Sequence, residues 1–447
     1  MSEAPIPRTF TSAGPVRGHA RVPGDKSISH RALILSAMAV GESRIEGLLE
    51  SEDIIATVAA LWAMGSEIGQ DSNGNWVVNG VGVGGLLQPE TALDMGNSGT
   101  SARLLMGLAA SNAITATFIG DASLSRRPMG RIIEPLSRMG ASFSVTPGER
   151  LPLMVHGRVP AVPIEYRLPV ASAQVKSAIM LAALNTPGVT RVMEPERTRD
   201  HSERMLAGFG AEVGIEEVDG ERVISVTGEA ELNPHNMSIP GDPSSAAFPV
   251  VAALLVPGSE VVIQHVGINP TRTGLFEVLK QMDADITYEN ERDVGGEPVA
   301  DIRVRHSALT GIEVSPEIAP RMIDEFPILF VAAALAKGET VTTGLQELRH
   351  KESDRLALMA EGLAQLGVRL KEHPDGLTII GSDGEKLKGE YATPQIATAL
   401  DHRIAMSFAV AGLVSAHGVT IDDVRPMATS FPSFPPMLAD LGAIAAE

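Results

Sequence analysis

Six segments of the chain share one pattern, in which a short polar opening runs directly into an apolar stretch rich in Ala and Leu. The intervals between successive openings are 70 to 81 residues, and the openings begin at Gly24, Gly96, Ala171, Gly241, Met322 and Asp401. In five segments a glycine follows the start by 16 or 17 residues, at Gly41, Gly188, Gly258, Gly338 and Gly418. This spacing predicts a helix of about four turns that ends at the glycine, followed by a short strand.

Each segment continues with a second amphipathic helix pattern, a tight turn and another strand. The second residue of this turn stands at positions 65, 140, 210, 283, 367 and 442. Ala-rich helices and glycine turns can look alike by chance. Two independent markers keep the same order along the chain, however, so we interpret the pattern as a sixfold internal repeat.

A twofold repeat is nested inside the sixfold one. The sequence Arg-Val-Pro-Gly-Asp at 21–25 returns as Ser-Ile-Pro-Gly-Asp at 238–242, with three segments between the two copies and three after the second. Pro-Gly is common in ordinary turns. Its position at the half-repeat, however, favours two domains, with the chain crossing from one domain to the other at each Pro-Gly-Asp segment. We expect the first domain at 24–240 and the second at 1–23 plus 241–447, with the strand within 12–23 belonging to the second.

Composition limits the classes of partner. The 447 residues are 44% hydrophobic and 20% charged, which is typical of a globular chain of two or three domains. The absence of cysteine excludes disulfides, thiolate metal sites and a cysteine nucleophile. A net charge of −19 disfavours nucleic acid and anionic membranes as partners, and no apolar run is long enough to span a bilayer. The first residues resemble neither a signal peptide nor a transit peptide, so we expect a soluble cytoplasmic protein.

Charged residues gather at the starts of the predicted first helices. A helix N-terminus carries unpaired N–H groups and about half a positive charge, which favours anions. Lys26 and Arg31 add two cations to such an end, an unfavourable placement unless an anion joins them. A helix-capping role would explain Ser27 alone. The nucleotide-binding Gly-x-x-x-x-Gly-Lys motif is absent from the chain.

Further cations and two acids occur in the corresponding places of the other segments. Lys351 and Arg355 are expected on one face of a helix, with Glu352 between them as an acid or base. Several cations indicate substrates with several anionic groups. The histidines lack a metal-ligand spacing, so we expect proton transfer by carboxylates and lysine without a metal or an organic cofactor. The set comprises Lys26, Arg31, Arg127, Arg199, Lys351, Arg355 and Arg403 with Asp324 and Glu352, all expected around one pocket between the domains.

Six motifs follow one another along the chain: Pro-Gly-Asp-Lys-Ser-Ile-Ser-His-Arg, Gly-Asn-Ser-Gly-Thr, Arg-Arg-Pro-Met, Ser-Ala-Gln-Val-Lys-Ser, Lys-Glu-Ser-Asp-Arg-Leu and Asp-His-Arg-Ile-Ala-Met. Together they resemble the 5-enolpyruvylshikimate-3-phosphate synthase family. The resemblance runs in order from about residue 12 to the end of the chain. It implies an α/β fold, a two-domain inside-out α/β barrel of six βαβαββ repeats, three in each domain. It also implies a monomer whose domains close on the substrates.

The resemblance implies transfer of the enolpyruvyl group of phosphoenolpyruvate to the 5-hydroxyl of shikimate 3-phosphate, with release of phosphate. Asp324 would be the base, Glu352 would move a proton at the methylene carbon, and Lys26 would be the third catalytic residue. The residues that match the shikimate 3-phosphate site are Lys26, Ser27, Arg31, Ser172, Ala173, Gln174, Thr198, Arg199, Asp324 and Lys351. Those that match the phosphoenolpyruvate site are Lys26, Gly99, Arg127, Gln174, Arg355 and Arg403.

The chain departs from part of this family. Thr429 stands where many members have a lysine, and Ala173 stands where many have a second serine. Several motifs resemble the bacterial subgroup that tolerates the inhibitor glyphosate, but tolerant members can carry Ala where this chain has Gly99. Because glycine leaves room for an inhibitor longer than phosphoenolpyruvate, we expect glyphosate to inhibit this protein.

Three other functions are compatible with parts of the pattern. The sister enzyme that acts on UDP-N-acetylglucosamine shares the fold, but its usual cysteine is missing here. A non-catalytic binder of phosphorylated metabolites would not need the two acids, and a scaffold would not need cations at helix starts. Phosphate release from phosphoenolpyruvate and shikimate 3-phosphate together, compared with each alone, distinguishes these functions.

Overall fold

The computed structural model describes residues 4–390 and 393–445 and divides into two compact units. The first unit contains the N-terminal segment up to Pro23, the segment Pro240–Arg292 and the chain from Pro298 onward. The second unit contains Gly24–Ile239 together with Asp293–Glu297. Each unit has its own apolar core.

The second unit is built from three successive repeats of helices and strands. In chain order these are α1 (Lys26–Met38), β3 (Val40–Glu46), α2 (Glu52–Ala63), β4 (Glu67–Gln70), β5 (Trp76–Val81), β6 (Leu93–Asp94), α3 (Gly99–Ala110), β7 (Thr115–Ile119), the 3₁₀ turn η1 (Leu124–Arg126), α4 (Gly130–Arg138), β8 (Ser142–Thr146), β9 (Arg150–His156), β10 (Glu165–Arg167), α5 (Ala173–Ala183), β11 (Val189–Glu194), α6 (His201–Gly208), β12 (Val213–Val218), β13 (Glu221–Thr227) and β14 (Met237–Ser238).

The first unit contains the other three repeats and both strands at the N-terminus. These are β1 (Arg8–Phe10), β2 (Arg17–Arg21), α7 (Pro243–Leu255), β15 (Glu260–Gly267), α8 (Gly274–Gln281), β16 (Asp285–Val294), β17 (Glu297–Arg305), β18 (Glu313–Val314), η2 (Pro316–Ile318), α9 (Ala319–Met322), η3 (Ile323–Glu325), α10 (Phe326–Leu335), β19 (Glu339–Thr342), η4 (Gln346–His350), α11 (Arg355–Gln365), β20 (Arg369–His373), β21 (Gly376–Ile380), β22 (Gln395–Ile396), α12 (His402–Leu413), β23 (Val419–Ile421), η5 (Arg425–Thr429) and α13 (Phe434–Asp440). The tip of the β16–β17 hairpin is the short segment that belongs to the second unit.

Six small sheets repeat one strand plan. In the sheet β6-β7-β9-β8 the edge strand β6 runs parallel to β7, while β9 is antiparallel to both of its neighbours. Four other sheets have the corresponding order, β14-β3-β5-β4, β10-β11-β13-β12, β2-β15-β17-β16 and β18-β19-β21-β20. In the sixth sheet β22 is parallel to β23, and β1 from the N-terminus takes the third place. The predicted α/β fold with six βαβαββ repeats is therefore confirmed, with the last repeat completed by the start of the chain.

The two Pro-Gly-Asp sequences have the same local structure. Each follows a short edge strand, β2 or β14, that pairs in parallel with the strand after the first helix of a repeat. Each aspartate then caps a helix. Asp25 accepts from the backbone N–H of Ile28 at 2.9 Å, and Asp242 accepts from that of Ser244 at 2.8 Å. The motif recurs because both chain passages end an edge strand and begin a buried helix within a few residues.

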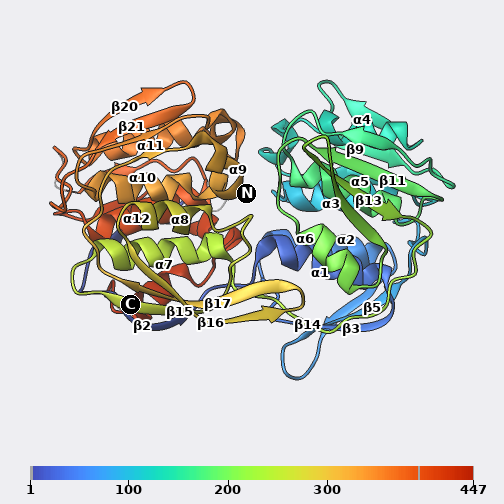
Figure 1. The fold of residues 1–447 in the computed structure, drawn as a ribbon, viewed down its shortest axis with the longest axis horizontal. Coiled ribbons are helices and arrows are strands. Elements are labelled where there is room, and N and C mark those ends of the chain that lie inside the picture. The colour runs from blue at the N-terminus through green and yellow to red at the C-terminus, as the bar shows by residue number, and fades with distance from the viewer. Residues whose placement is uncertain (1–3, 391–392, 446–447) are drawn as a thin grey trace. The chain divides into compact units, whose positions relative to one another are not determined.

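The first helix of each repeat forms the interior of its unit. Every residue of α7 and of α10 is buried, and Figure 1 shows α7, α10 and α12 stacked side by side in the first unit. A helix that is apolar on all sides must be covered on all sides, and the surrounding sheets supply that cover. None of the described helices is both long enough and apolar enough to cross a membrane.

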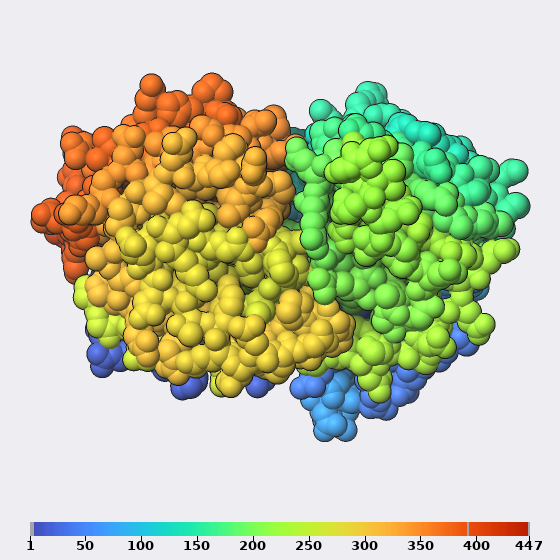
Figure 2. All heavy atoms as spheres, viewed as in Figure 1, coloured from blue at the N-terminus to red at the C-terminus, as the bar shows by residue number. Residues whose placement is uncertain are grey.

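The outer strands face solvent. Most side chains of β16 are exposed, and Figure 2 shows the β16–β17 hairpin in yellow at the surface of the molecule. From Ala300 to Arg305 the side chains of β17 alternate between buried and more exposed, and Ile302 and Val304 belong to the core of the first unit. This alternation is typical of a sheet with one face packed on the core and the other face exposed to solvent.

The predicted turns are confirmed, but the predicted helix ends are too late. The second turn residue has a positive φ in all six repeats, and Asp283 adopts it without being a glycine. The first helices end three to five residues before the marker glycines, at Met38, Ala183, Leu255, Leu335 and Leu413. These glycines also have positive φ. They therefore turn the chain from helix to strand rather than form the last residue of the helix.

Helices α3 and α5 pack so closely that one glycine is required. A methyl group on Gly107 would lie 2.3 Å from the carbonyl oxygen and 2.8 Å from the Cα of Ala178. Because the obstacle is backbone, one helix would have to shift. We predict that Gly107→Ala lowers the free energy of unfolding by about 1–3 kcal/mol, although alanine is the better helix former. Urea unfolding of the purified protein measures this change.

Gly208→Ala is the matched control, since Gly208 ends α6 and a methyl group added there would have no described atom of a neighbouring element within 4 Å. Its free energy of unfolding should stay the same or rise by about 0.5–1 kcal/mol. Equal effects of the two substitutions would contradict the packing argument.

Candidate functional site

The start of α1 presents Lys26 and Ser27 close to the surface of the second unit. Asp25 caps the helix, so the alternative that Ser27 is only a helix cap does not hold. The ammonium of Lys26 contacts the carboxylate of Asp53, and about a quarter of the lysine side chain is exposed. An acid beside the lysine offsets the unfavourable placement of a cation at a helix N-terminus.

Arg31 lies one turn further along α1 and points into the interior. Its Nη1 donates to the Ser27 carbonyl at 2.9 Å, its Nε to Ser202 Oγ at 2.7 Å and its Nη2 to Ser177 Oγ at 2.7 Å. The side chain is almost completely buried. Arg31 therefore ties the start of α1 to α5 and α6, and its positive charge lies just behind Ser27.

The starts of α3 and α5 come together through Gln174. This side chain donates to Thr100 Oγ1 at 3.0 Å and accepts from Arg103 Nη1 at 2.7 Å. Ser172 caps α5 by accepting from the backbone N–H of Val175. Since α3 begins at Gly99 and α5 at Ala173, two helix N-termini with unpaired N–H groups lie next to one another.

Arg127 joins this group from the loop after η1. Its backbone is extended, at φ −79° and ψ 131°, as is typical of a residue before proline. Its Nη2 donates to Asn97 Oδ1 at 2.8 Å and to Ser123 Oγ at 3.3 Å. A methyl group on Gly99 would lie 3.3 Å from Arg127 Nη1, so this arginine lies beside the start of α3.

The loop before α6 carries Thr198 and Arg199. The Thr198 hydroxyl donates to the carboxylate of Glu194, the last residue of β11. Asp200 accepts from Arg204 Nε at 3.0 Å and from Arg197 Nη2 at 3.2 Å. The loop is thus fixed at both ends, while Arg199 between them is half-buried.

A second group of predicted residues gathers in the first unit around Asp324. Its Oδ1 lies 3.3 Å from Lys351 Nζ and 3.3 Å from Arg355 Nη1. Arg355 also donates to the carboxylate of Glu352. The two predicted acids therefore share one guanidinium. Asp324 and Glu352 remain partly exposed, at 17% and 27% of their side-chain surface.

Asp401 holds Arg355 from the buried side. Its Oδ2 accepts from Arg355 Nε at 2.8 Å and from Ser353 Oγ at 2.9 Å, and its Oδ1 accepts from the Arg403 backbone at 2.9 Å. Burial raises the pKa of Asp401, but the charge and hydrogen bond of Arg355 together with the charge of His402 hold that pKa below its usual value. Burial opposes the charge of Arg355, yet Asp401, Glu352 and Asp324 together raise its pKa. The arginine therefore remains charged although it is 1% exposed.

Arg403 completes this group from the first turn of α12. Its Nη1 donates to the backbone carbonyl of Asp324 at 3.0 Å and lies 3.5 Å from Glu325 Oε1. Glu325 is buried and also accepts from the Ser244 hydroxyl. Residues from three repeats of the first unit are thus joined within a few ångströms.

One local prediction is wrong. Lys351 and Arg355 do not share a helix face, because α11 begins only at Arg355. Asp354 accepts from the backbone N–H of Ala357 at 3.0 Å and so fixes the helix start after Lys351. Both cations nevertheless contact Asp324. Thr429, at the position of the family lysine, donates to the Pro426 carbonyl within η5.

Two acids that orient the expected cations were not predicted from the sequence. Asp53 contacts Lys26 and Asp401 contacts Arg355, while the expected Gln174 contacts Arg103, a cation that was also not predicted. The one available signal was the position of Asp401 directly before a predicted helix, where an aspartate is typical of a cap. Among the described residues, no group of three or more His, Asp or Glu side chains is arranged to hold a metal ion.

Solved structures identify the class of fold. An enolpyruvyl transferase, NikO of Streptomyces tendae, superposes with a TM-score of 0.77 over 98% of each chain at 18% identity, which establishes the fold alone. EPSP synthase from Acinetobacter baumannii superposes with a TM-score of 0.87 at 45% identity, again over 98% of each chain. The fold is that of the enolpyruvyl transferases, as expected from the sequence.

Sequence comparison identifies the family. The model of the EPSP synthase (3-phosphoshikimate 1-carboxyvinyltransferase) family matches residues 10–438. A 3-phosphoshikimate 1-carboxyvinyltransferase of Novosphingobium aromaticivorans is 64% identical over 97% of this chain and 98% of the relative. One of Zymomonas mobilis is also 64% identical, over 98% of this chain and 96% of the relative. The chain belongs to the EPSP synthase family.

Buried His30, next to Arg31 on α1, gives a prediction for the pH dependence of stability. Burial, followed by the charges of Lys26 and Arg31, holds the pKa of His30 well below its usual value, and its Nδ1 lies 2.8 Å from Thr57 Oγ1. Below about pH 6.5 the unfolded chain therefore binds a proton that the folded chain does not. This difference lowers stability as the pH falls, by up to about 1.4 kcal/mol per pH unit.

We predict that His30→Asn removes this contribution. Urea unfolding between pH 5 and 7.5 should show a steeper loss of stability towards low pH in the wild type than in His30→Asn, and the curves should run parallel above pH 7. The other ten histidines are common to both proteins and cancel in the comparison. Parallel curves over the whole range would contradict a neutral His30.

Proposed function

We propose that the two groups of helix-start residues bind the two substrates of the family's reaction, phosphoenolpyruvate and shikimate 3-phosphate. The chain is an enolpyruvyl transferase of the shikimate pathway, as its membership of the family implies. The observation that best supports the residue roles is the cluster in which Asp324 and Glu352 share Arg355 beside Lys351. This cluster combines two partly exposed carboxylates with cations, as proton transfer on anionic substrates requires.

In this proposal the second unit binds the phosphate of shikimate 3-phosphate. Lys26 and Ser27 at the start of α1, Ser172, Ala173 and Gln174 at the start of α5, and Thr198 and Arg199 before α6 supply donors. Helix N-termini offer backbone N–H groups to an anion, and the nearby cations add charge. Arg31 contributes mainly its charge from behind Ser27, because its guanidinium already donates to three protein acceptors.

Phosphoenolpyruvate would bind to Lys26, Gly99, Arg127 and Gln174 of the second unit and to Arg355 and Arg403 of the first. Glycine at position 99 lets an anion approach the backbone N–H groups at the start of α3. Arg127 stands beside that start. Arg355 supplies its charge from within the acid cluster, since its N–H groups donate to Asp324, Glu352 and Asp401.

The proposed chemistry is an addition followed by an elimination. Asp324 accepts the proton of the shikimate 5-hydroxyl, whose oxygen forms a bond to C2 of phosphoenolpyruvate, while C3 gains a proton from Glu352 or Lys26. The tetrahedral intermediate then loses phosphate as C3 gives a proton back. Lys351 holds the hydroxyl group next to Asp324. Orientation of the two reactants contributes on the order of 7–11 kcal/mol to lowering the barrier.

Two further proposals concern the state of the protein. We propose that it works in the cytoplasm and as a monomer, in keeping with the family resemblance. The closure of its domains on the substrates stays a prediction.

Glu352→Gln tests the proposed proton transfer. Glutamine keeps the shape and an oxygen that can accept from Arg355, but it cannot exchange a proton at C3. We predict that kcat falls by about 10²–10⁴, while the dissociation constant of shikimate 3-phosphate changes less than threefold. Phosphate release is measured with both substrates together and with each alone.

Glu361→Gln is the matched control, because Glu361 is an exposed acid on the same helix α11. It should leave kcat unchanged. Full activity in Glu352→Gln would remove Glu352 from the chemistry. Absence of phosphate release by the wild type with both substrates would contradict the proposed function itself.

Glyphosate should inhibit phosphate release in competition with phosphoenolpyruvate, and Gly99→Ala should weaken that inhibition. The added methyl group would lie 3.0 Å from Arg103 Nη1 and 3.3 Å from Arg127 Nη1, which is tighter than ordinary contact. We predict that the glyphosate concentration for half-inhibition rises at least tenfold, and more than the KM for phosphoenolpyruvate. Gly208→Ala serves as the remote control. Undiminished wild-type turnover with glyphosate well above the phosphoenolpyruvate concentration would contradict the prediction.

A further inference from the structure

A cluster of four buried charges lies inside the second unit, and none of its four residues has been assigned a role above. Lys176 Nζ lies 2.7 Å from Glu203 Oε1 and 2.9 Å from Glu194 Oε1. Arg222 Nη1 lies 3.4 Å from Glu203 Oε1 and 3.5 Å from Glu194 Oε2. The exposed fractions of these side chains are 0% for Lys176 and Glu194, 2% for Glu203 and 9% for Arg222. Two positive and two negative charges cancel.

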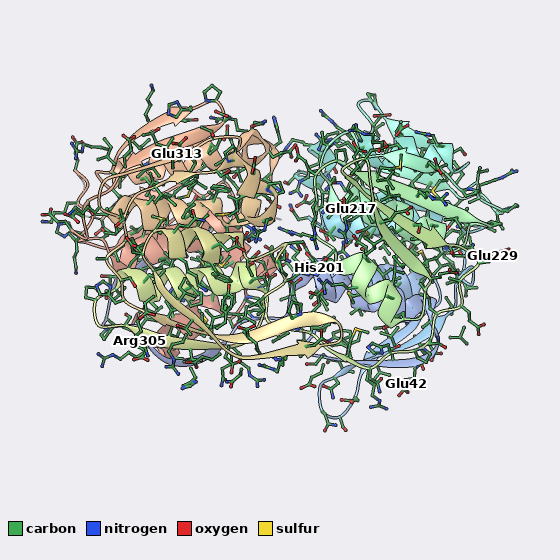
Figure 3. All side chains as sticks on the ribbon, in the orientation of Figure 1. Glu42, His201, Glu217, Glu229, Arg305 and Glu313 are labelled. Carbon is green, nitrogen blue, oxygen red and sulfur yellow. The ribbon has the colours of Figure 1, made fainter. Side chains whose placement is uncertain are left out.

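The cluster joins four elements of the backbone. Lys176 comes from the first turn of α5, Glu194 from the end of β11, Glu203 from the first turn of α6 and Arg222 from β13, where it stands opposite Glu194. Figure 3 labels His201, the first residue of α6, two positions before Glu203. Buried ions are strongly unfavourable unless every charge has its partner close by. The four elements can therefore shift against one another very little.

Three of the proposed phosphate-binding segments are attached to this cluster. Glu194 accepts from the Thr198 hydroxyl, which fixes the loop that carries Arg199. Lys176 follows the capped start of α5, where Ser172 and Gln174 stand. The neighbouring residues Ser177 and Ser202 accept from Arg31 of α1 and lie 2.7 Å from each other. The pair Lys176–Glu203 and the pair Ser177–Ser202 thus form two adjacent links between α5 and α6.

One carboxylate in the cluster depends directly on Lys176. Glu203 Oε2 is buried without a hydrogen-bond partner among the described residues. Its charge is therefore compensated through Oε1 alone, which both Lys176 and Arg222 approach. Removal of the lysine charge leaves two carboxylates and one cation. The unpaired negative charge is strongly unfavourable in a buried site, so the side chains and the backbone elements that carry them must shift.

We propose that Lys176 is a positioning residue for the phosphate group of shikimate 3-phosphate. It acts through Glu194 and Glu203, which set the spacing between the start of α5 and the Thr198–Arg199 loop. The proposal rests on the proposed function, because it deepens the role of that phosphate site. A purely structural ion pair would instead stabilise the unit without favouring one substrate over the other.

Lys176→Met tests the proposal, since methionine has a similar volume and no charge. We expect the dissociation constant and the KM of shikimate 3-phosphate to rise at least tenfold. The KM of phosphoenolpyruvate should change less than threefold under the same conditions. The double variant Lys176→Met/Glu203→Gln leaves one positive and one negative charge, so it should recover shikimate 3-phosphate binding to within about threefold of the wild type.

Arg167→Met is the matched control. Arg167 pairs with Glu221 in the same sheet, but 59% of its side chain is exposed, so loss of this pair should leave both KM values unchanged. Should Lys176→Met not fold, Glu203→Gln alone replaces it. That change leaves an excess positive charge, and it should raise the ratio of the two KM values, shikimate 3-phosphate over phosphoenolpyruvate, at least threefold.

The outcomes separate this proposal from the proposed function. An unchanged KM ratio in folded Lys176→Met, an equal rise of both KM values, or a double variant that fails to recover binding would each overturn the positioning role. Phosphate release by the wild type is tested first, with both substrates. If phosphate release is absent, the proposed function is wrong. If phosphate release is present, the variants test only the role of Lys176.

Discussion

The pairing of buried cations with acceptors at helix starts is the constraint on which the rest of this structure depends. Arg31, Lys176 and Arg355 are each almost completely buried, and each is held by partners from at least two other elements. A buried charged side chain can move little, because the loss of one partner leaves its desolvation energy uncompensated and destabilises the fold. The cations therefore fix the helix starts, and the helix starts carry the residues proposed to bind the substrates.

The repeated architecture makes this arrangement possible. Each repeat places an apolar helix inside its unit, with its N-terminal end preceded by a short polar segment. Small residues such as Gly107 and Ala178 allow α3 and α5 to approach closely, which brings the starts at Gly99 and Ala173 together. A net charge of −19 thus coexists with groups of cations at helix starts, and acids pair with the cations of these groups.

The two groups of site residues differ in how far the sequence could predict them. The cations were recognisable from the motifs, because lysine and arginine at helix starts are unusual. Asp401 and Glu194 were not recognisable in this way, since an acid before a helix indicates only a cap and an acid at a strand end is ordinary. Their significance comes from Arg355 and Lys176, which stand 46 and 18 positions away in the chain. The helix start after Lys351 also escaped prediction, because it depends on a single capping hydrogen bond from the backbone N–H of Ala357 to Asp354.

The sequence by itself determined the sixfold repeat, the buried first helices, the positive-φ turns and the family resemblance. The repeat, the buried helices and the turns rest on patterns within about 80 residues, where spacing and local propensity are visible in the order of the amino acids. The resemblance rests on short motifs that keep the same order along the chain. The pairing of β1 with β23, the meeting of Asp324 with Arg355 and the four-charge cluster around Lys176 were decided only by the tertiary structure. Contacts between distant positions depend on how whole elements pack, and no local pattern records which buried charge will meet which partner.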